Sequence, residues 1–191
     1  MIWFYFVLSY LIGTIMFGYI IIKFLYRKDI RLQGSGNVGA RNAGRIFGKK
    51  AFVIIFLGDA LKGSMVVLVA QYLQFSDSIQ LLGLGIAILG HLWPITLNFK
   101  GGKGISAFIG GIIAFEPLSV PVILLSFLVL YPFVRSFTVA GLGAFVFIPI
   151  LLLFRDYDGL SCFILIGILL VIILVHSENL FERLSYFGRK K

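Results

Sequence analysis

Seven apolar stretches occupy most of this chain of 191 residues and leave only short polar connections between them. A helix needs roughly 20 mostly apolar residues to cross the hydrocarbon core of a bilayer. Hydrophobic residues make up 60% of the chain and charged residues only 13%, a composition unlike that of soluble domains. The sequence therefore predicts an all-α integral membrane protein, a seven-transmembrane-helix bundle forming one domain over residues 1–191. The expected spans are 2–25, 51–73, 78–98, 105–115, 117–134, 137–154 and 159–175.

The fourth predicted span is short. As a helix, residues 105–115 would rise only about 16 Å, whereas the hydrocarbon core is roughly 30 Å thick. This segment could therefore form a half-helix or a re-entrant segment. The N-terminal segment carries no early basic residue, and its apolar run exceeds the usual core of a signal peptide, so we expect the first span to be retained.

The distribution of charge predicts the orientation of the bundle. Basic residues gather in the first, third and fifth connections and in the C-terminal tail, whereas the other connections hold mainly acidic residues, with Arg155 as the exception. The positive-inside rule then places the N-terminus outside and the C-terminus inside. Topology and attraction to anionic lipid headgroups account for the net charge of +9, so no nucleic-acid partner is expected.

Cysteine and histidine are too scarce for the usual disulfide or metal frameworks. Cys162 is the only cysteine and lies within a predicted span, which excludes a disulfide within the chain. The two histidines, His91 and His176, are separated by much of the chain and predict no zinc site. We therefore expect no metal and no cofactor, and the sequence indicates no particular oligomeric state.

Three polar blocks interrupt the apolar pattern, and the predicted topology puts all three at the cytoplasmic surface. The first, residues 34–45, reads GSGNVGARNAGR. Its glycines let backbone N–H groups converge on a ligand without obstruction by a Cβ atom, while Arg41 and Arg45 add fork-shaped donors suited to phosphate. The block predicts a loop that cradles a phosphate. The alternative is a flexible basic loop that serves only topology.

The second block, residues 99–104, reads FKGGKG and directly precedes the fourth span. Its glycines and the following amides could form a helix N-terminus facing an anion, with Lys100 and Lys103 supplying positive charge. It lacks the spacing of a nucleotide-binding P-loop, and the alternative is that both lysines only set topology. Just upstream, we expect Pro94 to kink or end a helix and His91 to be a structural hydrogen-bonding residue.

The third block begins where the last span ends and reads HSEN, residues 176–179. His176 could act as a general base, a general acid or a phosphate ligand. Its alternative role is to cap the final helix at the membrane interface.

Within the spans, polar and small residues predict helix contacts. Asp59 and Lys62 are three residues apart, so they can pair on one helix face and avoid separate burial of two charges. Close packing is expected at small residues in the third and fourth spans, namely Gly83, Ala87, Gly110 and Gly111.

Together, SGNVGARNAGR, GHLWPITLNFKGGKG and HSEN resemble the three ordered signatures of the bacterial acyl-phosphate-dependent glycerol-3-phosphate acyltransferase family, PlsY, along nearly the whole chain. The resemblance implies a single transmembrane acyltransferase domain in the bacterial cytoplasmic (inner) membrane, with its site facing the cytoplasm. It implies transfer of a fatty acyl group from acyl phosphate to the 1-hydroxyl of sn-glycerol 3-phosphate, giving lysophosphatidic acid and phosphate. The implied partners are these two substrates and membrane lipid.

The resemblance also implies the residues of the site. It assigns catalysis to Ser35, His176 and Asn179, and support of the site to His91. Substrate and phosphate binding is assigned to Gly36, Asn37, Gly39, Asn42, Arg45, Lys100, Gly101, Gly102, Lys103 and Gly104. Two positions depart from the expected family pattern. Arg41 stands where a small hydroxyl residue is expected, and Arg183 lies one residue later in the chain than the pattern predicts.

The residue types fit this chemistry. An acyl phosphate is a mixed anhydride whose phosphate leaves readily, so the enzyme mainly has to align the acceptor hydroxyl and stabilise the developing oxyanion. His176 is the expected base, although a substrate phosphate could take the proton instead. Neither histidine is followed five positions later by Asp, since Thr96 and Phe181 stand there, which agrees with a donor other than acyl-CoA.

Two other classes of protein compete with the enzyme. An anion or phosphate transporter would also use glycine, arginine and lysine, but its ligands would lie near the bilayer midplane. A structural membrane-assembly subunit would explain the spans and leave the three polar blocks without a role.

Overall fold

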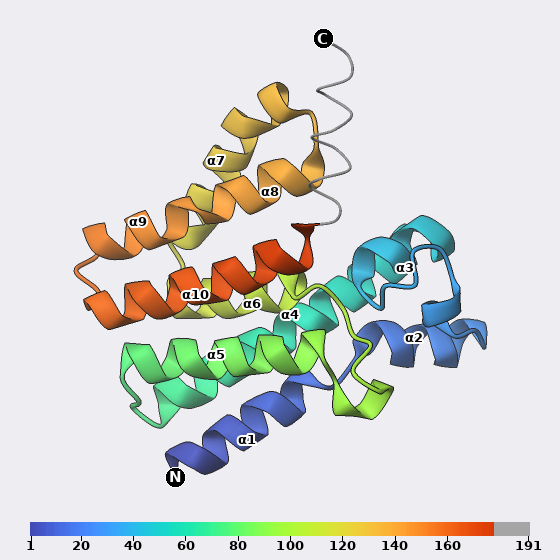
Figure 1. The fold of residues 1–191 in the computed structure, drawn as a ribbon, viewed down its shortest axis with the longest axis horizontal. Helices are drawn as coiled ribbons and strands as arrows, with labels where there is room; N and C mark the ends of the chain where they lie inside the picture. The colour runs from blue at the N-terminus through green and yellow to red at the C-terminus, as the bar shows by residue number, and fades with distance from the viewer. Residues whose placement is uncertain (178–191) are drawn as a thin grey trace. The chain divides into compact units, whose positions relative to one another are not determined.

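The computed structural model describes residues 1–177, and this part of the chain consists of helices and connecting turns without a strand (Figure 1). The predicted all-α fold is confirmed, while Asn179 and Arg183 lie outside the described residues. The α-helices are α1 (Ile2–Gly13), α2 (Phe17–Tyr26), α3 (Ala40–Phe47), α4 (Lys49–Tyr72), α5 (Asp77–Leu92), α6 (Ile105–Phe115), α7 (Ser119–Val134), α8 (Phe137–Phe145), α9 (Phe147–Phe154) and α10 (Gly159–Val175). Two short 3-10 helices are η1 (Ile30–Leu32) and η2 (Ile95–Leu97).

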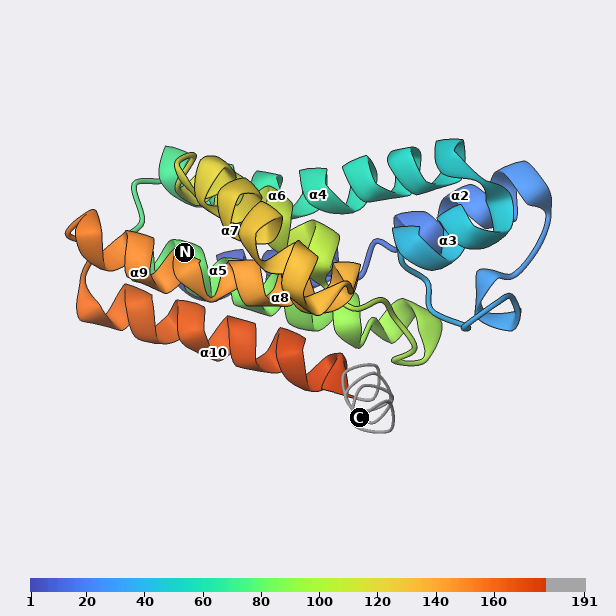
Figure 2. The ribbon, with the colours of Figure 1, turned by 90° about the horizontal axis from the view of Figure 1, so that it is seen from above.

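The chain forms two compact units, Met1–Pro117 and Leu118–Lys191. In the first unit α4 is the central helix, because it packs against α1, α2, α3, α5 and α6. Figures 1 and 2 show α2 and α3 together at one end of α4. In the second unit α7 packs against α8 and α9, and α9 packs against α10.

Helices occupy all seven segments that were predicted as spans. Within residues 1–177, four stretches are long and apolar enough to cross a membrane, namely Ile2–Tyr26, Lys49–Tyr72, Asp77–Leu97 and Phe137–Phe154. The shorter apolar helices α6, α7 and α10 cover the other three segments. The positions of the helices thus agree with the sequence pattern, whereas seven crossings and their orientation stay predictions.

The first predicted span is interrupted, which corrects the expectation of one helix over residues 2–25. α1 ends at Gly13 and α2 begins only at Phe17. Such an interruption leaves backbone carbonyl groups without their usual helical partners. The sequence offers no proline or other strong signal at this point, and the partners of these carbonyls come from other elements.

Close packing at the predicted glycines is confirmed. A Cβ atom at Gly83 would overlap the hydroxyl of Tyr5, and one at Gly110 would overlap the backbone of Ala60. At the same contact the Ser64 hydroxyl donates a hydrogen bond to the Gly110 carbonyl at 2.7 Å. The short α6 is therefore held directly against α4.

Candidate active site

The first polar block is half loop and half helix, which corrects the prediction of a loop throughout. Residues 34–39 form the loop, and α3 begins at Ala40 with Gly39 as its N-cap residue. The helix forms because its small residues Ala40 and Ala43 are buried on one face while charged residues take the other face. Gly36 has a φ of 72°, a left-handed backbone that favours glycine.

Asn42 holds this loop in shape. Its buried side chain accepts a hydrogen bond from the backbone N–H of Ser35 at 3.0 Å and donates to the carbonyls of Gln33 and Asn37, both at 2.9 Å. The side chain of Asn37 in turn accepts from the backbone N–H of Gly39 at 2.7 Å. These contacts of the two asparagines lie within the loop, so their binding of substrate stays a prediction.

The same loop presents a basic surface. The side chains of Ser35, Arg41 and Arg45 are exposed. Arg41 and Arg45 are four residues apart in α3 and therefore lie on one face of the helix. Guanidinium groups beside a glycine-containing loop can attract and orient phosphate oxygens.

The second polar block is anchored in the same core as the first. Leu97, in the η2 turn that precedes the block, shares a hydrophobic cluster with Val38 and Ala43 of the first block. Within the second block, the backbone N–H of Gly102 donates to the carbonyl of His91 at 3.0 Å. The folded first unit therefore fixes both blocks to common elements.

The second block leads into α6 as predicted. Gly104 is the N-cap residue, with a φ of 81° that favours glycine. Lys100 is exposed and Lys103 is half-buried just before this helix end. The first backbone N–H groups of a helix point outward without intrahelical partners. This arrangement has the chemical groups that an anion site requires.

His176 follows α10 in the second unit and is buried there. Its Nδ1 atom lies 2.8 Å from the carbonyl oxygen of Ile172. Because a carbonyl only accepts hydrogen bonds, Nδ1 carries the proton, and in the neutral ring Nε2 keeps a lone pair. A general base acting through Nε2 needs this tautomer. Ser35 and the second block belong to the other unit, and the meeting of all three blocks in one site stays a prediction.

The predicted pair of Asp59 and Lys62 is confirmed, with Lys62 Nζ 3.2 Å from Asp59 Oδ1. Sequence reasoning missed a third member, since His91 Nδ1 lies 3.7 Å from the same oxygen. The available signal was that all three residues occupy apolar spans, where polar groups need partners. His91 was expected to form hydrogen bonds, but among the described residues its Nδ1 has no hydrogen-bond partner. Within residues 1–177, no three His, Cys, Asp or Glu side chains gather into a metal site.

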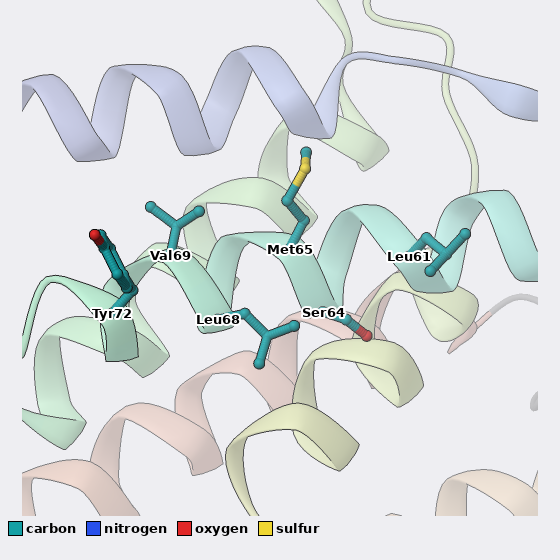
Figure 3. Close-up of a pocket in the computed structure, with 6 residues that line it drawn as sticks. All are labelled: Leu61, Ser64, Met65, Leu68, Val69 and Tyr72. Atoms are coloured by element: carbon teal, nitrogen blue, oxygen red, sulfur yellow. The ribbon is translucent and has the colours of Figure 1, made fainter.

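Figure 3 shows a surface hollow on α4, and none of its lining residues is a predicted site residue. Its lining is almost entirely apolar and consists of Leu61, Ser64, Met65, Leu68, Val69 and Tyr72. None of these residues belongs to the three polar blocks. The hollow therefore contributes no group to the predicted chemistry.

Comparison with known proteins decides the family. The family model described as glycerol-3-phosphate acyltransferase matches residues 3–185. The chain belongs to the glycerol-3-phosphate acyltransferase family. It is 46% identical over 170 residues to glycerol-3-phosphate acyltransferase 1 of Bacillus cereus, covering 89% of this chain and 93% of the relative. It is 35% identical over 188 residues to the protein of the same name from Desulfitobacterium hafniense, covering 96% of this chain and 91% of that relative.

Solved structures agree with this assignment. The fold is similar to that of PlsY, an integral membrane glycerol 3-phosphate acyltransferase, in its glycerol 3-phosphate form, with a TM-score of 0.87 and 34% identity. For the lysophosphatidic acid form of PlsY, the TM-score is 0.86 and the identity 32%. Each comparison covers 96% of this chain and 92% of the other. The family that the three polar blocks predicted is confirmed. The chain described here is therefore a membrane acyltransferase for glycerol 3-phosphate.

Proposed function

We propose that this acyltransferase takes its acyl group from acyl phosphate and transfers it to the 1-hydroxyl of sn-glycerol 3-phosphate, giving lysophosphatidic acid and phosphate. The reaction takes place at the cytoplasmic face of a bacterial inner membrane, which the chain crosses seven times with its N-terminus outside. The glycerol 3-phosphate and lysophosphatidic acid forms of the similar PlsY structures support the acceptor and the product.

The observation that carries the proposal is the common anchoring of two basic, glycine-containing segments. Val38 and Ala43 of the first segment and Leu97, just before the second, lie in one hydrophobic cluster. Each segment also carries an exposed cationic residue, Arg45 on the first and Lys100 on the second. Both proposed reactants carry phosphate, so two fixed cationic segments suit a reaction between two anions.

The chemistry assigns a role to each group. Arg45 and Lys103 clamp phosphate, assisted by Ser35 and the glycine amides, so that the acceptor hydroxyl faces the acyl carbonyl. The hydroxyl oxygen forms a bond to the carbonyl carbon while its proton passes to Nε2 of His176. Collapse of the tetrahedral oxyanion breaks the bond to phosphate, which leaves with the electron pair. Asn179 orients the acceptor.

A variant of His176 tests the proton transfer. If Nε2 is the base, His176→Ala lowers kcat by about 10²–10⁴-fold and removes one ionisation from the pH dependence of the rate. If a substrate phosphate takes the proton, the variant changes KM and keeps the shape of that pH dependence. The second result assigns His176 to positioning.

The donor is tested with purified protein and labelled glycerol 3-phosphate. Acyl phosphate, acyl-CoA and acyl-carrier protein are offered separately, each with and without a metal chelator. Labelled lysophosphatidic acid from acyl phosphate alone, unaffected by the chelator, is the expected result. Product from a thioester donor but not from acyl phosphate would overturn the proposed donor, and no product from any donor with folded protein would overturn the proposed reaction.

A further inference from the structure

A buried polar cluster in the first unit reaches two segments outside its own helices. Asp59 and Lys62 of α4 and His91 of α5 are each no more than 2% exposed. Buried charges are expensive in a protein interior and are often replaceable by apolar residues without loss of stability. The contacts of this cluster with other segments indicate a role besides stability.

The first connection is to the interruption between α1 and α2. Lys62 Nζ donates to the carbonyl of Gly13 at 2.9 Å and to that of Ile15 at 2.7 Å. Between them, the carbonyl of Thr14 accepts from the hydroxyl of Thr96 at 3.1 Å. Three successive carbonyls at the interruption therefore receive partners from α4 and from the η2 turn that precedes the second polar block.

The second connection runs through His91 to the second polar block itself. One side of the imidazole faces Asp59, with 3.7 Å between Nδ1 and Oδ1. On the other side, a Cβ atom at Gly102 would overlap the ring at Nε2, and its three nearest neighbours would all be ring atoms of His91. The Gly102 N–H also donates to the His91 carbonyl at 3.0 Å. The ring is thus a spacer between Asp59 and Gly102.

We infer that Asp59, Lys62 and His91 form a positioning device for the segment Lys100–Gly104. Lys62 fixes the interruption between α1 and α2, Asp59 balances the charge of Lys62 and faces the ring, and the ring sets the place of Gly102. Gly102 adjoins Lys103, so its position constrains the backbone from which the Lys103 side chain extends just before α6. The inference rests on the proposed binding of phosphate by this segment, and it makes the three buried residues positioning residues without contact to the reacting atoms.

Lys62→Met tests the device because it removes the ammonium group and keeps a long side chain. Size exclusion in detergent first checks that the variant is folded. We then expect the KM of glycerol 3-phosphate or of acyl phosphate to rise about tenfold or more, since small displacements of binding groups are costly. Gly83→Ala is the matched control: it overfills a buried contact with Tyr5, and Gly83 belongs neither to the cluster nor to the second block. It should lower Tm and leave both KM values unchanged. If Lys62→Met does the same, the cluster is only structural and the inference fails.

A double-mutant cycle keeps the test decisive if Lys62→Met does not fold. Gly102→Ala should raise the same KM about tenfold in the native background, because its methyl group displaces the His91 ring. In the His91→Ala background that methyl group finds vacated space, so the effect should largely disappear. Equal effects of Gly102→Ala in both backgrounds would overturn the contact that carries the inference.

The pair of substitutions Lys100→Ala and Lys103→Ala separates this inference from the proposed function. If both KM values are unchanged in the double variant, the segment does not bind phosphate, and its proposed role fails together with the reason to position it. If the lysine variant raises KM while Lys62→Met and the cycle do not, only the positioning inference fails.

Discussion

Asn42 makes three hydrogen bonds that close the first polar block around its side chain. Ser35 contributes its backbone N–H to this arrangement, and its hydroxyl side chain stays exposed. At the scale of single residues, the structure therefore separates groups that shape the loop from groups that the loop presents. The two kinds of group should respond differently to substitution.

Asn42→Ala removes all three hydrogen bonds and is expected to destabilise the loop. We expect the free energy of unfolding to fall by about 1–3 kcal/mol, measured by thermal unfolding in detergent. Ser35→Ala is the comparison, because it keeps the N–H that Asn42 binds and removes only the hydroxyl. It should lower turnover without changing Tm. If Ser35→Ala lowers Tm as much as Asn42→Ala, the hydroxyl supports the loop and not the substrate.

Asp29 and Arg31 give a residue-scale prediction for pH dependence. Arg31 donates to the Asp29 carboxylate, with one contact of 2.7 Å, and this hydrogen bond lowers the pKa of Asp29 from its ordinary value of 3.8. Because the folded pKa lies below the unfolded one, the contribution to stability is fully present above the unfolded pKa. It is lost as the pH falls through the folded pKa.

Asp29→Asn keeps an oxygen for the Arg31 backbone N–H and removes the charge. The variant should have a slightly lower Tm than the native protein at neutral pH, since the pair is partly exposed. This difference should shrink as the pH falls below 3.8 and disappear once the pH is below the folded pKa, which is lower than 3.8. A difference that is the same at both pH values would show that the carboxylate charge contributes nothing.

At the scale of elements, α6 depends on glycines that let two backbones meet. A Cβ at Gly63 of α4 would overlap the backbone of Ala107, and one at Gly110 of α6 would overlap that of Ala60. Gln71 adds a hydrogen bond to the carbonyl of Ala114 at 3.1 Å. These contacts secure a helix of only 11 residues, and they also hold the helix end that follows the second polar block.

Gly63→Ala and Gly110→Ala should each destabilise the protein by about 1–3 kcal/mol, because an added methyl group forces the two helices apart. Chemical or thermal unfolding in detergent measures the loss. Gly167→Ala in α10 is the control, since a Cβ there meets no described atom within 4 Å and alanine favours the helix by about 1 kcal/mol. Equal stability of all three variants would contradict close backbone packing between α4 and α6.

At the scale of the whole molecule, the membrane topology determines whether the site faces the cytoplasm or the outside of the cell. The basic connections predict that the first and second polar blocks face the cytoplasm. Leu32 in η1 is 82% exposed, and Ser76 is exposed at the opposite end of α4 and α5. These two positions report on opposite sides of the predicted membrane.

Single-cysteine variants in a Cys162→Ala background test this topology. A membrane-impermeant maleimide should label Ser76→Cys in intact cells, because that position faces outside. It should label Leu32→Cys only after the inner membrane is permeabilised. The reverse pattern would invert the topology and place the first polar block outside.

The sequence by itself determined the all-α membrane architecture, the positions of the apolar helices and the family, because hydrophobic spacing and the three ordered polar blocks are local properties of the chain. It also predicted the pair of Asp59 and Lys62, which lie one helical turn apart. Only the tertiary structure decided that α1 stops at Gly13, that Asn42 organises its own loop, and that His91 joins the buried pair. The physical reason is that each of these depends on which groups from distant segments meet. Lys62 satisfies the carbonyls of Gly13 and Ile15, about 50 positions earlier in the chain, and in an apolar interior an unpaired backbone group finds no water to replace such a partner.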